Sequence, residues 1–257
     1  MLLVISPAKT LDFENPPVIR KHTQPQLLEH STELMQSLRP LTPDQLSELM
    51  SISPALGELN WQRNQQWAPP FSADNAKQAL LAFRGDVYTG LDADSFSADD
   101  FAFAQQHLRI LSGLYGLLRP LDLIQPYRLE MGTALANSRG ANLYRFWGEI
   151  ITTALNKELK RADGPLINLA SGEYFKAVHP KTLAADVVTP IFKERKNGGD
   201  YKIVSFPAKR ARGMMSAFII RNRLQQPDEM RRFDDAGYRF NGKLSRDNDW
   251  VFTRDVS

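Results

Sequence analysis

The chain has 257 residues, of which 42% are hydrophobic and 24% charged, and its formal net charge is +3. This length and apolar content allow a large buried core, and because no repeat and no Ser-, Gly- and Pro-rich linker interrupts it, we expect one domain over residues 1–257. The absence of cysteine excludes disulfides, thiolate metal sites, iron–sulfur clusters and cysteine nucleophiles.

The N-terminal part predicts a buried strand followed by several helices. Residues 2–5 form an apolar run that stops at Ser6-Pro7, which is typical of a buried strand. This start lacks the basic and long apolar regions of a signal peptide, and no 18-residue apolar run follows, so we expect a cytoplasmic protein without membrane contact. Apolar spacing then predicts helices over residues 24–37, 43–52, 54–67 and 74–83.

Residues 98–125 are expected to form a helix-hairpin-helix. Apolar residues recur at helical spacing over residues 97–111, and Gly113-Leu-Tyr-Gly116 then permits a tight turn. The backbone N–H groups of such a turn can face outward and bind phosphate. The alternative is an ordinary connection between two core helices, because helix-hairpin-helix loops usually read Gly-apolar-Gly and this loop is one residue longer.

The second half of the chain mixes local strand pairs with helices. Strands are expected over residues 165–170, 186–195, 201–206, 238–240 and 250–253, and helices over residues 143–161 and 209–224. The turn Lys196-Asn-Gly-Gly-Asp200 is expected to join two of these strands as a hairpin. This mixture predicts an α+β fold with a mixed sheet and many helices, rather than a regularly alternating, doubly wound sheet.

Charge is segregated along the chain. Between Lys193 and Arg223, nine basic residues oppose two acidic ones, whereas residues 85–108 hold five aspartates and neither Lys nor Arg. On the helix expected over residues 209–224, Lys209, Arg212 and Arg223 share a face, and Gly213 beside it could let a phosphate approach. The basic face is either a nucleic-acid contact or a solvated helix face. The aspartates are either loop and helix-start charges or an oxygen-rich iron site.

A second group of polar residues suggests a different class of function. Lys9, Arg84, Glu173, Tyr174 and Lys176 follow expected strands or glycine-bounded turns and could line an enzyme site for a nucleotide or damaged DNA, in which a buried lysine forms a Schiff base. The simpler interpretation is a surface ammonium for Lys9 and core packing for Tyr174. The four histidines lie far apart and no hydrolase, zincin or dinucleotide motif is present, so we expect neither a metal site nor a cofactor.

Five segments stand out as long motifs in a fixed order: Ile5-Ser-Pro-Ala-Lys-Thr-Leu11, Phe83-Arg-Gly-Asp-Val-Tyr-Thr-Gly-Leu91, residues 111–122 with Gln125-Pro-Tyr-Arg-Leu-Glu-Met131, Asn168-Leu-Ala-Ser171 and Glu173-Tyr-Phe-Lys176. Together they resemble the YaaA family of bacterial peroxide stress resistance proteins over nearly the whole chain. The resemblance implies a cytoplasmic protein that helps cells survive hydrogen peroxide and is linked to limiting intracellular iron and to DNA repair. It also implies a single-domain mixed α/β fold with a positively charged cleft and a DNA-binding helix-hairpin-helix. It brings no established catalytic residues.

The leading hypothesis is therefore a monomeric protein that binds duplex or branched DNA by shape rather than by sequence. The predicted phosphate contacts in the hairpin are the amides of Ser112, Gly113 and Gly116, aided by Arg109 and Arg119. The predicted contacts in the cleft are Lys209, Arg210, Arg212 and Arg223.

Overall fold

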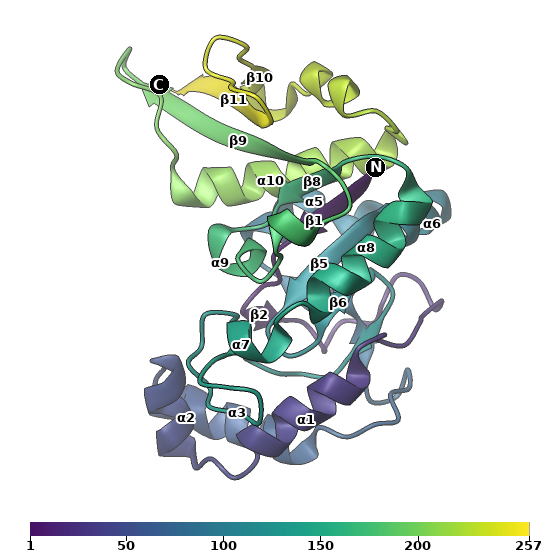
Figure 1. Cartoon of the computed structure of the whole chain (residues 1–257), viewed down its shortest axis with the longest axis vertical. Coiled ribbons are helices and arrows are strands. Elements are labelled where there is room, and N and C mark those ends of the chain that lie inside the picture. Colours follow the sequence, from purple (N-terminus) through teal and green to yellow (C-terminus); the bar gives the residue numbers. More distant parts are fainter. Residues whose placement is uncertain (257) are drawn as a thin grey trace.

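A computed structural model describes residues 1–256, and its centre is a seven-stranded mixed sheet (Figure 1). The strands lie in the order β10, β11, β9, β8, β1, β5 and β6. Their bounds are Leu2–Ile5 (β1), Leu108–Ser112 (β5), Gly116–Leu118 (β6), Leu166–Leu169 (β8), Val187–Lys196 (β9), Arg239–Phe240 (β10) and Asp249–Val256 (β11). The five inner strands are parallel, and β10 and β6 are antiparallel edge strands. The predicted α+β class with a mixed sheet is confirmed.

The central strands β1, β5 and β8 are buried at every position, as expected for parallel strands that helices cover. All four residues of β1 are buried, and all five of β5. The helix α6 (Ala98–His107) contacts β1 and β5, and α8 (Ile150–Ala162) contacts β1 and β6. Figure 1 shows α8 in front of the sheet and α6 behind it. No helix within residues 1–256 is long and apolar enough to cross a membrane.

Helices α1 (Leu28–Leu38), α2 (Pro43–Met50) and α3 (Pro54–Gln66) lie at the end of the molecule opposite β10 and β11 (Figure 1). Two two-stranded pairs lie outside the main sheet, β2 (Thr10–Leu11) with β4 (Phe83–Arg84) and β3 (Lys77–Gln78) with β7 (Leu123–Ile124). The helix predicted over residues 74–83 is therefore wrong. Only α4 (Ala79–Ala82) is helical there, because the flanking backbone pairs with other segments.

The predicted helix-hairpin-helix at residues 98–125 is wrong. The helix α6 ends at His107, and the chain continues directly into β5, which pairs with β1 on one side and turns back into β6 on the other. A short run rich in apolar residues satisfies helical and strand spacing equally, and here the neighbouring β1 decides in favour of a strand. A short loop between two consecutive helices is found at Ser51–Ser53, between α2 and α3, where Ser51 has a φ of 49°.

Three other predicted elements differ in their extent. The helix expected over residues 143–161 is divided at Gly148 (φ +41°) into α7 (Leu143–Trp147) and α8. The helix α10 (Ser205–Arg221) begins four residues earlier than predicted and includes the last two residues of the strand expected over residues 201–206. Of that strand, only a single bridge between Glu194 and Lys202 remains. The predicted C-terminal strand pair is confirmed as β10 and β11.

Candidate functional site

A cavity of about 380 Å³ opens at the carboxyl ends of β1 and β8. These strands are neighbours, but the chain proceeds from β1 to β5 on one side and from β8 to β9 on the other. Such divergence leaves a crevice at the carboxyl edge of a parallel sheet, where ligands commonly bind. Ser6 and Ser171 follow the two strands, and the backbone N–H of Ser171 donates to the Ser6 hydroxyl at 2.9 Å, which ties the two loops together.

Five separate segments contribute side chains to this cavity. They are the loop after β1, the turn between β4 and α5 (Asp86–Leu91), Glu130, the loop after β8 with α9 (Gly172–Phe175), and α10. The charged and phenolic residues of the lining are Lys9, Arg84, Asp86, Tyr88, Glu130, Glu173, Tyr174, Lys209 and Arg212. We call the space that these residues line the β1–β8 cavity.

The two cations on the loop side of the β1–β8 cavity are neutralised by carboxylates. The Lys9 ammonium lies 2.7 Å from a carboxylate oxygen of Glu130. Arg84 pairs with both Asp12 and Asp94 at 3.0 Å. These ion pairs leave little attraction for a further anion on this side.

The two cations contributed by α10 differ from those of the loops. Within residues 1–256, no carboxylate oxygen lies within 4.0 Å of the charged nitrogens of Lys209 or Arg212. Burial lowers the pKa of the Arg212 guanidinium, and no neighbouring carboxylate counteracts this effect. A partly desolvated guanidinium without a counter-ion is costly, so this side of the cavity favours an anionic ligand.

The remaining wall of the cavity offers hydrogen-bond acceptors and buried phenols. Glu173 accepts a hydrogen bond from the backbone N–H of Gly132 at 2.9 Å. The Tyr88 hydroxyl donates to the backbone carbonyl of Ser6 at 3.2 Å. Burial raises the pKa of both Tyr88 and Tyr174, so both phenols stay protonated at neutral pH.

The predicted enzyme cluster is gathered only in part. Lys9, Arg84, Glu173 and Tyr174 all line the β1–β8 cavity, but Lys176 lies outside it, with its ammonium 4.9 Å from the centre of the Tyr144 ring. Lys9 and Lys176 are both exposed, so neither is the buried lysine that the Schiff-base hypothesis requires.

The phosphate contacts predicted in the hairpin are inaccessible, and this part of the hypothesis is wrong. Arg109 is 6% exposed and forms a buried ion pair with Glu158. Ser112 lies 2.7 Å from the hydroxyl of Tyr127. Both Gly113 and Gly116 are also buried.

The two hairpin glycines serve close packing instead of phosphate binding. A Cβ on Gly113 would lie 3.0 Å from the carbonyl carbon of Leu129, and one on Gly116 would lie 2.7 Å from the ring of Trp147. The indole N–H of Trp147 donates to the Gly113 carbonyl at 2.9 Å. Only glycine allows these neighbours to approach so closely.

Arg119 is also occupied by the interior of the protein. Its side chain donates to a carboxylate oxygen of Asp122 at 2.8 Å, and Asp122 is fully buried. The backbone N–H of Arg119 donates to the other oxygen of the same carboxylate at 2.8 Å. Arg119 therefore neutralises a buried acid and is not available as a DNA contact.

The basic face predicted on α10 is present only in the first half of the helix. Lys209 and Arg210 are exposed, whereas Arg223 lies beyond the helix and donates to Asp100 at 2.6 Å. Gly213 does not face solvent. A Cβ there would lie 2.7 Å from the backbone nitrogen of Leu91, so the missing side chain admits α5 and not a phosphate.

The acidic segment over residues 85–108 is paired with arginines. Asp92 lies 3.5 Å from Arg221, Asp94 lies 3.0 Å from Arg84, and Asp100 pairs with Arg223. Within residues 1–256, no group of three or more His, Cys, Asp or Glu residues is placed to hold a metal ion. The aspartates therefore act as partners for arginines and as helix-start charges.

Sequence reasoning missed two residues near the β1–β8 cavity. Glu130 lies after a strand end with no spacing that marks it. Phe206 is 70% exposed at the start of α10, and the Lys209 ammonium lies 5.7 Å from the centre of its ring. An exposed aromatic ring within a basic segment is a signal for base stacking, but the strand predicted over residues 201–206 concealed it.

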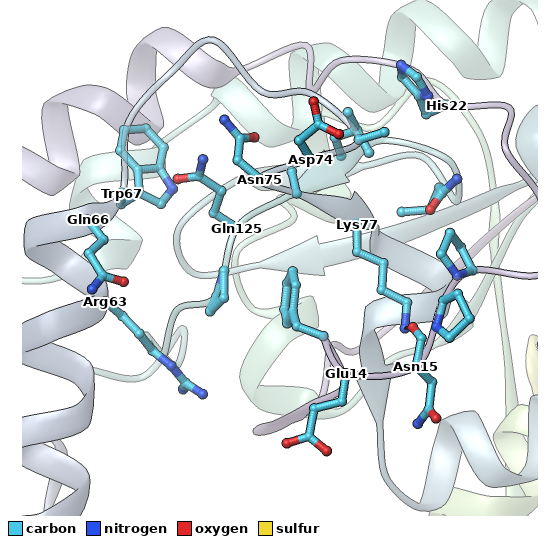
Figure 2. Close-up of a pocket in the computed structure, with 18 of the residues that line it drawn as sticks. Glu14, Asn15, His22, Arg63, Gln66, Trp67, Asp74, Asn75, Lys77 and Gln125 are labelled. Atoms are coloured by element: carbon cyan, nitrogen blue, oxygen red, sulfur yellow. Dashed lines mark hydrogen bonds between the residues drawn. The ribbon is translucent and has the colours of Figure 1, made fainter.

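A larger cavity, of about 840 Å³, lies between the end of α3 and the segment over residues 13–22 (Figure 2). Its buried cation is Lys77, whose side chain points toward Asn15 in Figure 2. The ammonium donates to the carbonyl oxygens of Asp12 at 2.9 Å and Asn15 at 2.8 Å. Lys77 is therefore already satisfied by backbone carbonyls.

Comparison with known proteins shows similarity to one family over nearly the whole chain. The family model described as "Peroxide stress protein YaaA" matches residues 1–244. A UPF0246 protein of Cellvibrio japonicus is 63% identical over 256 residues, which cover 99% of each chain. A UPF0246 protein of Colwellia psychrerythraea is 58% identical over 258 residues, covering all of both chains. A further UPF0246 protein, from Paraburkholderia xenovorans, is 55% identical over 260 residues and also covers both chains completely.

Proposed function

Because the chain belongs to the peroxide stress protein YaaA family, we propose that it acts in the hydrogen peroxide response by binding DNA through the first half of α10. The contact surface comprises Lys209 and Arg210, with Arg212 behind them in the β1–β8 cavity. It replaces the hairpin surface expected from the sequence.

The observation that carries the proposal is the lack of carboxylate partners around these three cations. At the far end of the same helix, Arg221 pairs with Asp92. Arg223, just beyond the helix end, pairs with Asp100. Unpaired cations that are close together attract a polyanion, because neutralised phosphates release their condensed counter-ions. Side chains that reach phosphates carry no base readout, so binding depends on DNA shape more than on sequence.

Two neighbouring features support the same surface. Lys196 and Lys202 are exposed on the connection that leads from β9 into α10 and extend the positive charge. Phe206, exposed one turn before Lys209 and Arg210, offers a ring on which an unstacked base can lie. We therefore expect stronger binding to DNA with unpaired or distorted bases than to a regular duplex.

The loop over Ser51–Ser53 is proposed as a second DNA contact. Ser51, Ser53, Pro54 and Ala55 are all exposed, and the 13-residue helix α3 begins there. Pro54 has no N–H and the N–H of Leu56 donates to the Ser53 hydroxyl, so this helix start offers a phosphate the N–H of Ala55 and the positive end of the helix dipole. The substitution Ala55→Glu separates this role from stability, since a carboxylate in the first turn favours the helix but repels DNA.

DNA binding also offers a link to iron. Ferrous ions associate with DNA phosphates as counter-ions, and a protein that neutralises those phosphates displaces them. We propose that this protects the covered DNA from iron-dependent oxidation. The test is the yield of strand breaks from ferrous iron and peroxide, which should fall on DNA bound by the protein.

The central test is fluorescence anisotropy with labelled duplex, bubble and single-stranded DNA across a salt series. The double charge reversal Lys209→Glu/Arg210→Glu should weaken binding to all sequences and reduce the slope of log affinity against log salt by about 1.8 for duplex DNA. The matched control is Lys157→Glu/Lys160→Glu, which changes the net charge equally at exposed residues of α8. Equal losses in both variants, or none in the first, would contradict the proposed surface.

A further inference from the structure

The β1–β8 cavity is too small for a double helix but has the size of a small-ligand site. Its volume of about 380 Å³ lies in the lower part of the range of about 300–1,000 Å³ that such sites occupy. It lies at the strand edge where the chain diverges, which is the usual ligand position in parallel sheets. A ligand held here is therefore one nucleotide-sized molecule or one unit of a longer chain.

The side of the cavity that α10 forms favours an anionic ligand. Arg212 and Lys209 project from successive turns of α10 and have no carboxylate within ion-pair distance in residues 1–256. Arg212 is the more deeply placed of the two, and a guanidinium can hold two phosphate oxygens at once. A phosphate group meets this need better than a carboxylate because it presents three oxygens and more charge.

Two other groups of the lining favour hydrogen-bond donors. Asp86 and Glu173 are carboxylates without a cation within 4.0 Å in the described part of the chain, and Glu173 receives one N–H from Gly132. These groups would repel inorganic phosphate, but they accept hydrogen bonds from base N–H or sugar O–H groups. The buried rings of Tyr88 and Tyr174 add apolar surface to the lining.

We propose that the β1–β8 cavity binds a single nucleotide, with its phosphate on Arg212 and Lys209 and its base or sugar directed toward Asp86 and Glu173. This deepens the proposed function, because the same cations reach DNA at the mouth of the cavity. The nucleotide is either a free mononucleotide or one displaced from the stack of bound DNA, and both share the same chemistry.

Isothermal titration calorimetry with dAMP, deoxyadenosine and inorganic phosphate tests the binding of a free nucleotide. We expect dAMP to bind more tightly than either fragment, and Arg212→Met to weaken it by about 10- to 100-fold. The matched control is Lys160→Met, which removes an exposed charge on α8, outside both the cavity and the proposed DNA surface, and should leave dAMP affinity unchanged. Glu173→Gln provides a second variant in case Arg212→Met fails to fold, and it should weaken dAMP without weakening phosphate.

Fluorescence of 2-aminopurine in a duplex, placed opposite an abasic site, tests a nucleotide displaced from DNA. A rise on binding of wild-type protein that is lost in Arg212→Met and kept in Lys160→Met assigns the nucleotide to DNA. Binding of dAMP without such a rise assigns it to a free mononucleotide. If neither dAMP binding nor a rise is seen, the inference is overturned, whereas DNA binding detected by anisotropy in the same preparation would leave the proposed function standing.

Discussion

Replacing Gly213 by alanine probes the crossing of α5 and α10, which places Arg212 in the β1–β8 cavity. At this crossing, a Cβ on Gly213 would lie 2.7 Å from the backbone nitrogen of Leu91 and still closer to the carbonyl of Val87. Gly90 on α5 faces α10 in the same way, since its Cβ would lie 3.0 Å from the backbone nitrogen of Met214. The obstructing atoms are backbone, so they cannot rotate aside as a side chain would.

The size of the effect follows from these contacts. Non-bonded carbon atoms pack best at about 3.5–4.0 Å, so the two helices must separate by more than about 1 Å to admit the methyl group. Overpacking of this kind costs about 1–3 kcal/mol, and a rigid backbone obstacle places Gly213→Ala at the upper end. The higher helix propensity of alanine stabilises α10 by about 1 kcal/mol, which offsets part of this cost. The net loss is therefore about 2 kcal/mol, which corresponds to a Tm lower by about 4–8 °C for a chain of this length.

Differential scanning calorimetry of wild type, Gly213→Ala and Gly172→Ala measures this loss. Gly172 is the matched control, because a Cβ there meets no atom within 4 Å, and its substitution should change stability by no more than about 0.5 kcal/mol. The reasoning is refuted if Gly213→Ala is as stable as wild type or more stable, since helix propensity alone would then describe the site.

Three further predictions concern groups in the interior. Arg109→Met should lower the free energy of unfolding by about 3–5 kcal/mol, because it leaves the largely buried Glu158 carboxylate without its cation. The double variant Arg109→Met/Glu158→Met should recover part of this loss, and urea titrations measure both. Asp122→Asn should cost about 2–3 kcal/mol by weakening the buried contacts with Arg119, again measured by urea titration. The backbone N–H of Asn15 donates to the Asp12 carboxylate and lowers its pKa. The ionised carboxylate therefore stabilises the folded protein fully above about pH 4, and this stabilisation is lost as the pH falls. Asp12→Asn should therefore show a smaller loss of stability than wild type between about pH 4 and pH 2, and an identical acid profile would contradict this.

The elements that could be predicted from the sequence are those with one dominant local signal. The helix α2 has a capping box between Thr42 and Gln45 with Pro43 at its first position, and α3 begins with a Ser53 cap followed by Pro54. The failures occur where a distant partner decides. Leu108 to Ser112 satisfies helical spacing, but β1 pairs with it from more than one hundred residues away. No local pattern records that partner.

The same distinction applies to the site. Polar residues after expected strands, such as Lys9 and Glu173, were identifiable because strand ends are exposed and often functional. Their association with Arg212 was not identifiable, because it depends on how α10 crosses α5. The prediction treated Arg109 and Arg119 as surface charges, but Arg109 pairs with Glu158, about fifty residues further along the chain, and Arg119 pairs with the buried Asp122 three residues away. Composition reports the charge of a residue and not the partner that neutralises it.

The position of β1 has a consequence for how the protein is made. It leaves the ribosome before the other strands of the sheet, yet Leu3 pairs with Leu108 on one side and with Ile167 on the other. An apolar tetrapeptide destined for the middle of the sheet therefore remains without its partners until more than half of the chain has been synthesised. Folds dominated by such distant pairings form slowly and expose apolar segments during the delay.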